Sequence, residues 1–282
     1  MIRLVSRAGL AAVASALLVS VSAFLPMILS GHLTRDSGVF LYTGMVVSRG
    51  GMPYVDSWDH KGPLLAAIES VAWHLGGGIL GAPILEGVVL FLGLAVAGII
   101  WSRSIGYAAA PAVLVVGVSY LGVFEGGNFT ETWLFPFQLV AYSAAAHLAL
   151  RAGRDAPARA TAAVGLLLGL ALATGLFTRM NNVVGLVLVV AVGAVFLRRR
   201  LLFLAVVVFA VALVGAALAL WLWTGDALRA GLDQYLRYNL FYSGGANAAD
   251  RLSAFGTLAQ LLVSSAVVVA VLLLAGAWLA RG

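Results

Sequence analysis

Cysteine is absent from this 282-residue sequence, and charge is scarce: 10% of the residues are charged, whereas 62% are apolar. Without cysteine the chain has no disulfide, no thiolate nucleophile and no cysteine-bound metal. With so few charged residues it also lacks the polar surface that a water-soluble globule of this length needs. The mean hydropathy of +1.05 therefore indicates a protein embedded in lipid.

Long apolar runs recur along the whole chain, and a helix of roughly twenty residues crosses a hydrocarbon core of about 30 Å. The predicted fold is all-α, a polytopic bundle of about eight transmembrane helices in a single membrane-embedded module, residues 1–282. A cleaved signal peptide is the alternative for the first run, although that run is longer than the apolar region of an ordinary signal peptide. The expected spans are Gly9–Leu29, Ile84–Trp101, Ala108–Phe124, Trp133–Leu150, Thr161–Phe177, Val183–Leu197, Leu201–Trp223 and Thr257–Ala280.

The basic residues predict how these helices are oriented, because cytoplasmic loops are enriched in arginine and lysine. With the N-terminus in the cytoplasm, the cytoplasmic segments hold ten arginines and a single acid, Asp155, and the outer segments hold the other ten acids. Loop arginines then account for the formal charge of +6, so a nucleic-acid partner is not expected. We expect a multi-pass protein of the cytoplasmic membrane, in contact with lipid, whose chemistry lies on the extracytoplasmic face.

The segment Pro63–Leu80 is apolar enough to be mistaken for a further span. Helical spacing places its apolar side chains on one arc, whereas Glu69 and His74 fall on the other. A spanning helix would hold one of these two groups in hydrocarbon, at a cost of about 2–4 kcal/mol if it were charged. The segment is therefore predicted to be an interfacial helix in a large first outer loop, residues 31–83. The last outer loop is expected at residues 224–256.

Polar side chains concentrate in the first outer loop, at Asp36, Tyr54, Asp56, Asp59, His60 and Lys61. A loop that only joined two helices could be far shorter, so this cluster is a candidate substrate site, with solvated linker charge as the alternative. Lys61 is the only lysine among 17 basic residues. An ammonium group at headgroup level can bind a lipid phosphate, and ordinary snorkelling is the competing interpretation.

Asp36 follows the first span closely and is the candidate general base. Attack by an acceptor hydroxyl on the anomeric carbon of a sugar needs a group that takes the proton. A phosphate leaving group also needs positive charge to stabilise it. Asp36 and Lys61 would meet these two needs. In the alternative interpretation, Asp36 only pairs with Arg35 or caps a helix.

Three further outer segments carry candidate substrate-binding side chains. Glu131 precedes the fourth expected span, where it could equally belong to a helix cap. Arg179 and Asn182 lie in the tight turn after the fifth span, and Arg179 is a candidate second phosphate ligand or a snorkelling side chain. Tyr238 and Asn239 mix aromatic and amide groups as sugar-binding surfaces do, although interfacial aromatic belts look alike. Histidines and acids show no ligand spacing, so neither a metal nor another cofactor is expected.

Taken together, these segments resemble polytopic GT-C glycosyltransferases of the protein mannosyltransferase and lipid A aminoarabinose transferase type, which are glycosyltransferase family 39-like. The resemblance rests on Pro-Tyr-x-Asp-x-Trp-Asp-His-Lys-Gly-Pro-Leu at 53–64, Asn-Phe-Thr-Glu-Thr-Trp at 128–133, Thr-Arg-Met-Asn-Asn at 178–182 and Gln-Tyr-Leu-Arg-Tyr-Asn at 234–239. It implies a polyprenyl-phosphate sugar as donor and an extracytoplasmic protein, lipid or glycan as acceptor. It also implies that Asp36 is the catalytic acid of the loop and that Lys61 contacts the donor phosphate.

The sequence departs from the family pattern in two places. Many relatives carry an acidic pair after the first span, whereas here Ser37 follows Asp36, so a second acid would come from Asp56, Asp59 or Glu131. Relatives also continue with further helices or a soluble acceptor-binding domain, which implies either a C-terminal truncation or a partner protein. Two other functions compete with the enzyme: a transporter or flippase of lipid-linked sugars, and an inactive assembly subunit.

Overall fold

The computed structural model describes residues 5–31, 35–75, 77–123 and 127–239, with only the backbone given for Arg35 and Val123. Contacts within the chain group residues 1–235 into one compact unit and residues 236–282 into a second. The described residues form helices and turns and contain no β-strand. The expected all-α class is therefore confirmed.

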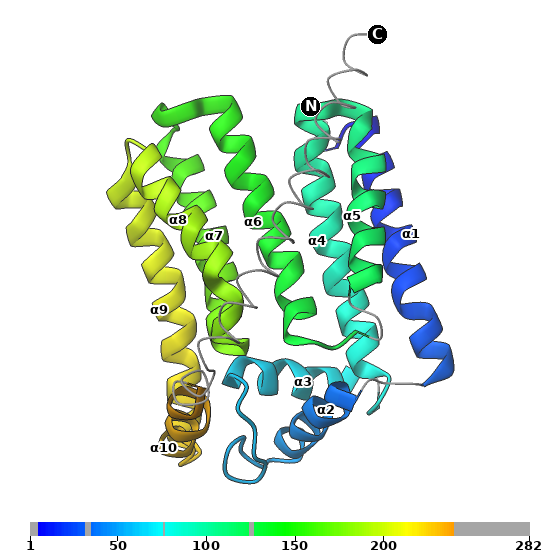
Figure 1. Ribbon diagram of the computed structural model, residues 1–282, viewed down its shortest axis with the longest axis vertical. Helices are drawn as coiled ribbons and strands as arrows, with labels where there is room; N and C mark the ends of the chain where they lie inside the picture. The colour runs from blue at the N-terminus through cyan, green and yellow to red at the C-terminus, as the bar shows by residue number, and fades with distance from the viewer. Residues whose placement is uncertain (1–4, 32–34, 76, 124–126, 240–282) are drawn as a thin grey trace, which may run out of the picture. The chain divides into compact units, whose positions relative to one another are not determined.

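The first unit is built from long helices that run side by side, with successive helices in opposite directions (Figure 1). Their bounds are α1 (Arg7–Ser30), α4 (Gly81–Ile105), α5 (Ala109–Val123), α6 (Thr130–Ala152), α7 (Ala158–Thr178), α8 (Val184–Phe196) and α9 (Arg200–Thr224). Seven of the eight expected spans coincide with one of these helices each. The eighth, Thr257–Ala280, lies outside the described residues.

The length and apolar composition of the helices indicate a membrane-embedded protein. Among the described residues, five helical stretches are long and apolar enough to cross a bilayer. The longest, Gly81–Gly122, comprises α4 and α5, and the chain reverses between them at Gly106, whose φ is +58°. α8 is shorter, and a 3₁₀ turn, Met180–Val183, precedes it.

Two apolar cores hold the long helices together. α1, α4 and α5 share one core, which includes Leu90 and Leu94. α6, α7, α8 and α9 share the other, which includes Leu168 and Phe203. α6 contacts both α4 and α7 and so joins the two halves. Many other large apolar side chains point outward, as a lipid environment allows.

Two short helices of the first loop, α2 (Arg35–Ser48) and α3 (Pro63–Leu75), lie at the end of the bundle where α1, α7 and α9 finish (Figure 1). α10 (Leu228–Gly231) and a π-helical turn, Leu232–Arg237, follow α9. The structure thus places a helix where an interfacial helix is predicted, and this helix ends at Leu75, directly before the glycine run 76–78 of the sequence. Within residues 1–235, the described loops predicted to be outer all lie at this end, and those predicted to be cytoplasmic lie at the other.

Candidate functional site

The polar segment between α2 and α3 is held against the end of α7 by its backbone. The Gly62 N–H donates to the Thr178 carbonyl at 2.8 Å. A Cβ atom at position 62 would lie 2.0 Å from the Phe177 carbonyl oxygen, so only glycine permits this approach. The contact holds Lys61 beside the residue that follows α7, Arg179.

The backbone of Lys61 is fixed on both sides by loop side chains. Its N–H donates to Asp59 Oδ1 at 3.0 Å, and its carbonyl accepts from the buried Tyr54 hydroxyl at 2.7 Å. Gln234 Nε2 in turn donates to the Tyr54 carbonyl at 2.7 Å. The Tyr235 hydroxyl donates to the carbonyl of Leu176, near the end of α7. Gln234 and Tyr235 lie in a predicted motif, yet their bracing role was not predicted.

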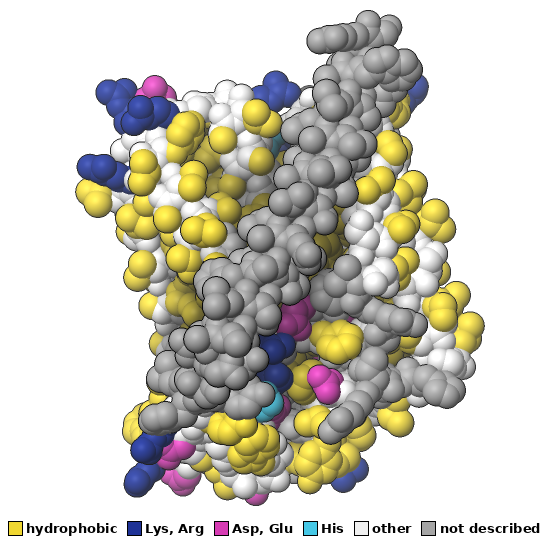
Figure 2. Space-filling view, viewed as in Figure 1, with side chains coloured by type: hydrophobic (Ala, Val, Ile, Leu, Met, Phe, Trp, Pro, Cys, Tyr) yellow, Lys and Arg dark blue, Asp and Glu magenta, His cyan; other side chains and the backbone are white. Residues whose placement is uncertain are grey.

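The side chain of Lys61 remains available for a ligand. It forms no ion pair or hydrogen bond with another residue of the described ranges. Burial and then the charge of Arg179 lower the pKa of Lys61, while Asp59, Glu131 and Asp36 oppose this shift. These four residues therefore lie within electrostatic range of the ammonium. Figure 2 shows basic, acidic and histidine side chains gathered in this part of the molecule.

Glu131 and Arg179 form an ion pair that links the start of α6 to the turn after α7. Arg179 Nη1 lies 2.9 Å from Glu131 Oε1, and the two side chains are 41% and 34% exposed. Asn182 Nδ2 donates to Thr130 Oγ1 at 3.4 Å and strengthens the same link. The structure thus brings together Glu131, Arg179 and Asn182, although Arg179 already has an acidic partner.

Asp36 lies in the first turn of α2 with its side chain exposed. Its charge acts on the pKa of His60 as well as on that of Lys61, which places it at the same site. α6 begins at Thr130, so Glu131 also belongs to the first turn of a helix, as the capping alternative predicts. Glu131 therefore lies in the first turn of α6 and also pairs with Arg179.

Asp59 and His60 complete the charged group. Asp59 is buried, and its Oδ1 lies 3.8 Å from His60 Nδ1. Burial raises the pKa of the Asp59 carboxyl, although hydrogen bonds from the backbone of Lys61 and His60 oppose it. Burial and then Lys61 lower the pKa of His60.

Three of the predicted residues play no described part in this group. Asp56 is exposed, and its Oδ2 accepts from the Met52 N–H at 2.7 Å, which closes a local turn. Tyr238 and Asn239 fall within the second unit, residues 236–282, and their role in substrate binding stays a prediction.

A second polar cluster, which the sequence pattern did not predict, is buried between α2, α3, α4 and α6. Glu69 and Glu86 are 0% and 1% exposed. Asn128 joins them: its N–H donates to Glu86 Oε2 at 2.8 Å, and its Nδ2 donates to Glu69 Oε2 at 3.4 Å. Nδ2 also donates to Ser37 Oγ at 2.9 Å, while Oδ1 accepts from Trp133 Nε1 at 2.9 Å. The cluster therefore reaches the residue next to Asp36.

The position of Glu69 corrects the predicted orientation of α3. Glu69 was expected on the polar, water-facing arc, but it is fully buried, whereas Val71 and Leu75 are 53% and 59% exposed. The physical reason is close packing against α2, since a Cβ atom at Gly44 would lie 2.5 Å from the Glu69 carbonyl. Burial and then Glu86 raise the pKa of Glu69 to about 8. Two carboxylates within otherwise apolar segments are the sequence signal that could have revealed this cluster.

Within the described residues, no three histidine or acidic side chains gather closely enough to hold a metal ion. The absence of a metal or other cofactor stays a prediction. Comparisons of the chain with protein-family models, curated proteins and solved structures found no match. The GT-C resemblance therefore rests on the sequence motifs alone.

Proposed function

We propose that this protein is a membrane glycosyltransferase that transfers a sugar from a polyprenyl-phosphate donor to an extracytoplasmic acceptor. One observation carries the proposal: Lys61 and Arg179 gather with the carboxylates of Asp36, Asp59 and Glu131 at one end of a membrane helix bundle. These residues come from four separate segments of the chain. A loop that only linked two helices would have no reason to bring charged residues from four segments together.

The two basic side chains suit the donor phosphate. A polyprenyl chain lies in the bilayer, so its phosphate lies at headgroup level, near the ends of α6 and α7. Lys61 offers an ammonium whose backbone is fixed by Asp59 and Tyr54. Arg179 keeps donors beyond the one that pairs with Glu131, because a guanidinium carries five N–H groups. The exposed fraction of the Arg179 side chain, 41%, leaves room for a second anion.

The proposed reaction is an inverting displacement at the anomeric carbon. The carboxylate of Asp36 accepts the proton of the acceptor hydroxyl as its oxygen attacks C1. The bond between C1 and the phosphate oxygen breaks, and the polyprenyl phosphate leaves with the electron pair. Lys61 and Arg179 stabilise the negative charge that develops on that phosphate. The exposed position of Asp36 at the start of α2 gives an acceptor access to it.

The test incubates purified protein with radiolabelled polyprenyl-phosphate sugars and a membrane extract that supplies acceptors. We expect Asp36→Asn to lower transfer by about 10²–10⁴-fold while donor binding stays nearly intact, because only the base is lost. Lys61→Ala should instead weaken donor binding. Asp226→Asn, which makes the same change at an exposed carboxylate, should leave both measurements unchanged.

Each of the competing functions predicts a different outcome. Transfer by Asp36→Asn at the wild-type rate would contradict the assignment of the base. Movement of labelled lipid across a vesicle bilayer without transfer of the label would support a flippase. Donor binding with neither transfer nor movement would support an assembly subunit.

A further inference from the structure

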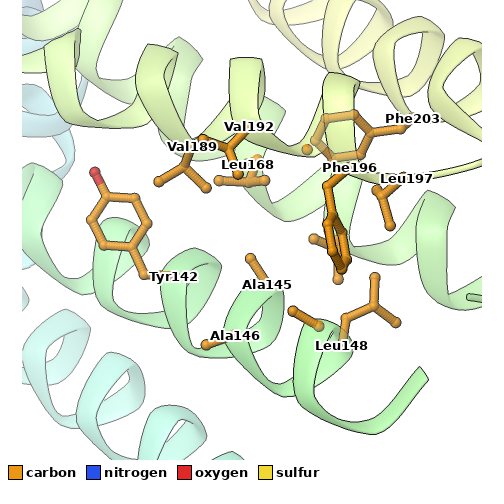
Figure 3. A pocket seen from close by; sticks show the side chains of 13 residues that line it. Tyr142, Ala145, Ala146, Leu148, Leu168, Val189, Val192, Phe196, Leu197 and Phe203 are labelled. Atoms are coloured by element: carbon orange, nitrogen blue, oxygen red, sulfur yellow. The ribbon is translucent and has the colours of Figure 1, made fainter. Parts of the chain in front are cut away.

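The opposite end of the first unit holds an apolar groove between α6, α7, α8 and α9. Its cavity has a volume of about 280 Å³. Side chains of α6, such as Ala145 and Leu148, face side chains of α8, such as Val189 and Phe196, across it (Figure 3). The Tyr142 hydroxyl is the only oxygen among the labelled side chains. We call this cavity the α6–α8 groove.

Small residues explain why the groove is open. Ala145, Ala146 and Ala149 of α6 line it, as does Gly193 of α8. A Cβ atom at Gly193 would lie 2.8 Å from the Phe203 ring, so that ring lies close against the α8 backbone. The groove follows α6 from Tyr142 to Ala149, a distance of about 10 Å at 1.5 Å rise per residue. Its shape and polarity suit an extended hydrocarbon chain.

A polar cavity lies next to one end of this groove, and part of its lining directly follows a groove residue in the sequence. The cavity, about 390 Å³, is lined by Asp155, Ala156, Arg198 and Arg199, and we call it the arginine pocket. Leu197, the residue before Arg198, lines the α6–α8 groove.

Two hydrogen bonds tie the turns of the groove and the arginine pocket together. The Arg198 N–H donates to the Arg154 carbonyl at 3.0 Å. Arg154 Nε donates to the carbonyl of Phe196, a groove residue, at 3.2 Å. A ligand at the mouth of the groove would therefore meet the arginines.

Positive charge exceeds negative charge at this end of the first unit. Asp155 is the only acid of the described turns here, and its ion pair with Arg198 is 2.9 Å long but 78% and 71% exposed. Arg199 forms no ion pair with a residue of the described ranges. Figure 2 shows the basic side chains gathered along this end with a single acidic neighbour. The described arginines at this end are Arg7, Arg103, Arg151, Arg154, Arg159, Arg198, Arg199 and Arg200.

We infer that this end binds an anionic phospholipid, with one acyl chain in the α6–α8 groove and the phosphate on Arg198 and Arg199. The apolar groove suits the acyl chain of such a lipid, and the arginine pocket suits its phosphate. A ligand with only one of these parts would occupy only one of the two cavities. Basic pockets between transmembrane helices recognise anionic headgroups in this way, and arginines attract the anionic leaflet. This site is separate from the proposed catalytic end and does not depend on the proposed function.

The experiment measures lipid binding to the purified full chain in detergent by native mass spectrometry. Phosphatidylglycerol and phosphatidylcholine with the same acyl chains are compared. We expect wild-type protein to bind phosphatidylglycerol about tenfold more tightly. The double variant Arg198→Gln, Arg199→Gln should bind both lipids equally. Arg229→Gln, an exposed arginine elsewhere in the first unit, should keep the wild-type preference.

A second variant tests the groove. Ala146 is exposed and lines the groove, so Ala146→Trp should fill it without disturbing a core and should weaken binding of both lipids. The unliganded melting temperature checks that each variant folds. Glycerophosphoglycerol, the headgroup without chains, should not bind measurably.

Three results would overturn the inference. Equal binding of the two lipids by wild-type protein would do so, as would a preference that survives loss of both arginines. Unchanged binding by Ala146→Trp would show that no acyl chain enters the groove.

Discussion

The two ends of the first unit are both polar, yet they are held together differently. At the α2–α3 end, Glu69 and Glu86 are buried and share Asn128 as a hydrogen-bond partner. At the arginine end, the ion pair between Arg198 and Asp155 is largely exposed. A buried carboxylate needs its partners because desolvation is expensive, whereas water can replace either partner of an exposed ion pair. Burial thus decides how much each charge matters for stability.

The loops at the two ends also differ in how firmly they are held by contacts with the rest of the unit. The first loop is anchored to the rest of the unit through Gly62, Tyr54 and Gln234, each of which contacts a residue distant in sequence or fixes the backbone of Lys61. The turns at the arginine end are short, and their arginine side chains are exposed. Changes at the first end should therefore have the larger effects.

The largest effect is expected from Gly62→Ala. Its Cβ atom would lie 2.0 Å from the Phe177 carbonyl oxygen, and neither backbone can yield without breaking the bond from Gly62 N–H to Thr178. We expect the free energy of unfolding to fall by about 3 kcal/mol or more, as in severe overpacking. Thermal unfolding of purified protein in detergent, followed by tryptophan fluorescence, measures it.

The matched control for Gly62→Ala is Gly38→Ala, in α2. A Cβ atom there meets nothing within 4 Å, and alanine favours a helix over glycine by up to about 1 kcal/mol. This variant should be as stable as wild type or more so. Equal melting temperatures for Gly62→Ala and wild type would show that the first loop is not anchored through this contact.

An intermediate effect is expected from pH at Glu69. Its pKa is raised from 4.5 to about 8, so the folded state keeps its proton while the unfolded state loses it. The free energy of unfolding should therefore fall as pH rises from about 4.5 to about 8 and then level off.

Glu69→Gln should reduce this pH dependence, because the amide cannot ionise and still offers Asn128 an acceptor oxygen. The measurement is the melting temperature of both proteins between pH 5 and pH 8, a range that lies between the ordinary pKa of Glu69 and its raised value. Asp155→Asn, at an exposed carboxyl, should keep the wild-type profile. An identical slope for Glu69→Gln and wild type would contradict a protonated, buried Glu69.

The smallest effect is expected from Asp155→Ala, which removes the ion pair with Arg198. Since both side chains are more than two-thirds exposed, the free energy of unfolding should change by less than about 1 kcal/mol. The same thermal unfolding assay at low and high salt measures it. A loss as large as that of Gly62→Ala would remove the contrast between the two ends.

Much of the fold follows from local sequence. The spans are predictable because an apolar run of sufficient length has few structures open to it in lipid other than a helix. Because successive helices run in opposite directions, the loops alternate between the two ends of the bundle. This alternation brings Lys61 to the same end as Arg179, although 118 positions separate them in the sequence. The site is therefore predictable as a set of residues at one end.

The contacts within that set are not predictable in the same way. Arg179 pairs with Glu131, and Gln234 braces Tyr54, because particular backbones approach closely at Gly62 and at the turn after α7. Asp56 was grouped with its neighbours, yet the hydrogen bond that its side chain accepts closes a local turn. Spacing along the chain does not say which of several nearby acids meets which base.

α3 shows the limit most clearly. Its sequence predicts a helix at the membrane surface, because Glu69 and His74 interrupt an otherwise apolar segment. Whether Glu69 faces water or the interior depends on Gly44 and Asn128, which meet it only after α2 and the start of α6 have packed against α3. The sequence by itself determined the helices and the end to which each loop belongs, through apolar length and alternation. Only the tertiary structure decided which carboxylates are buried and which arginines are paired, because those outcomes depend on contacts between segments far apart in the chain.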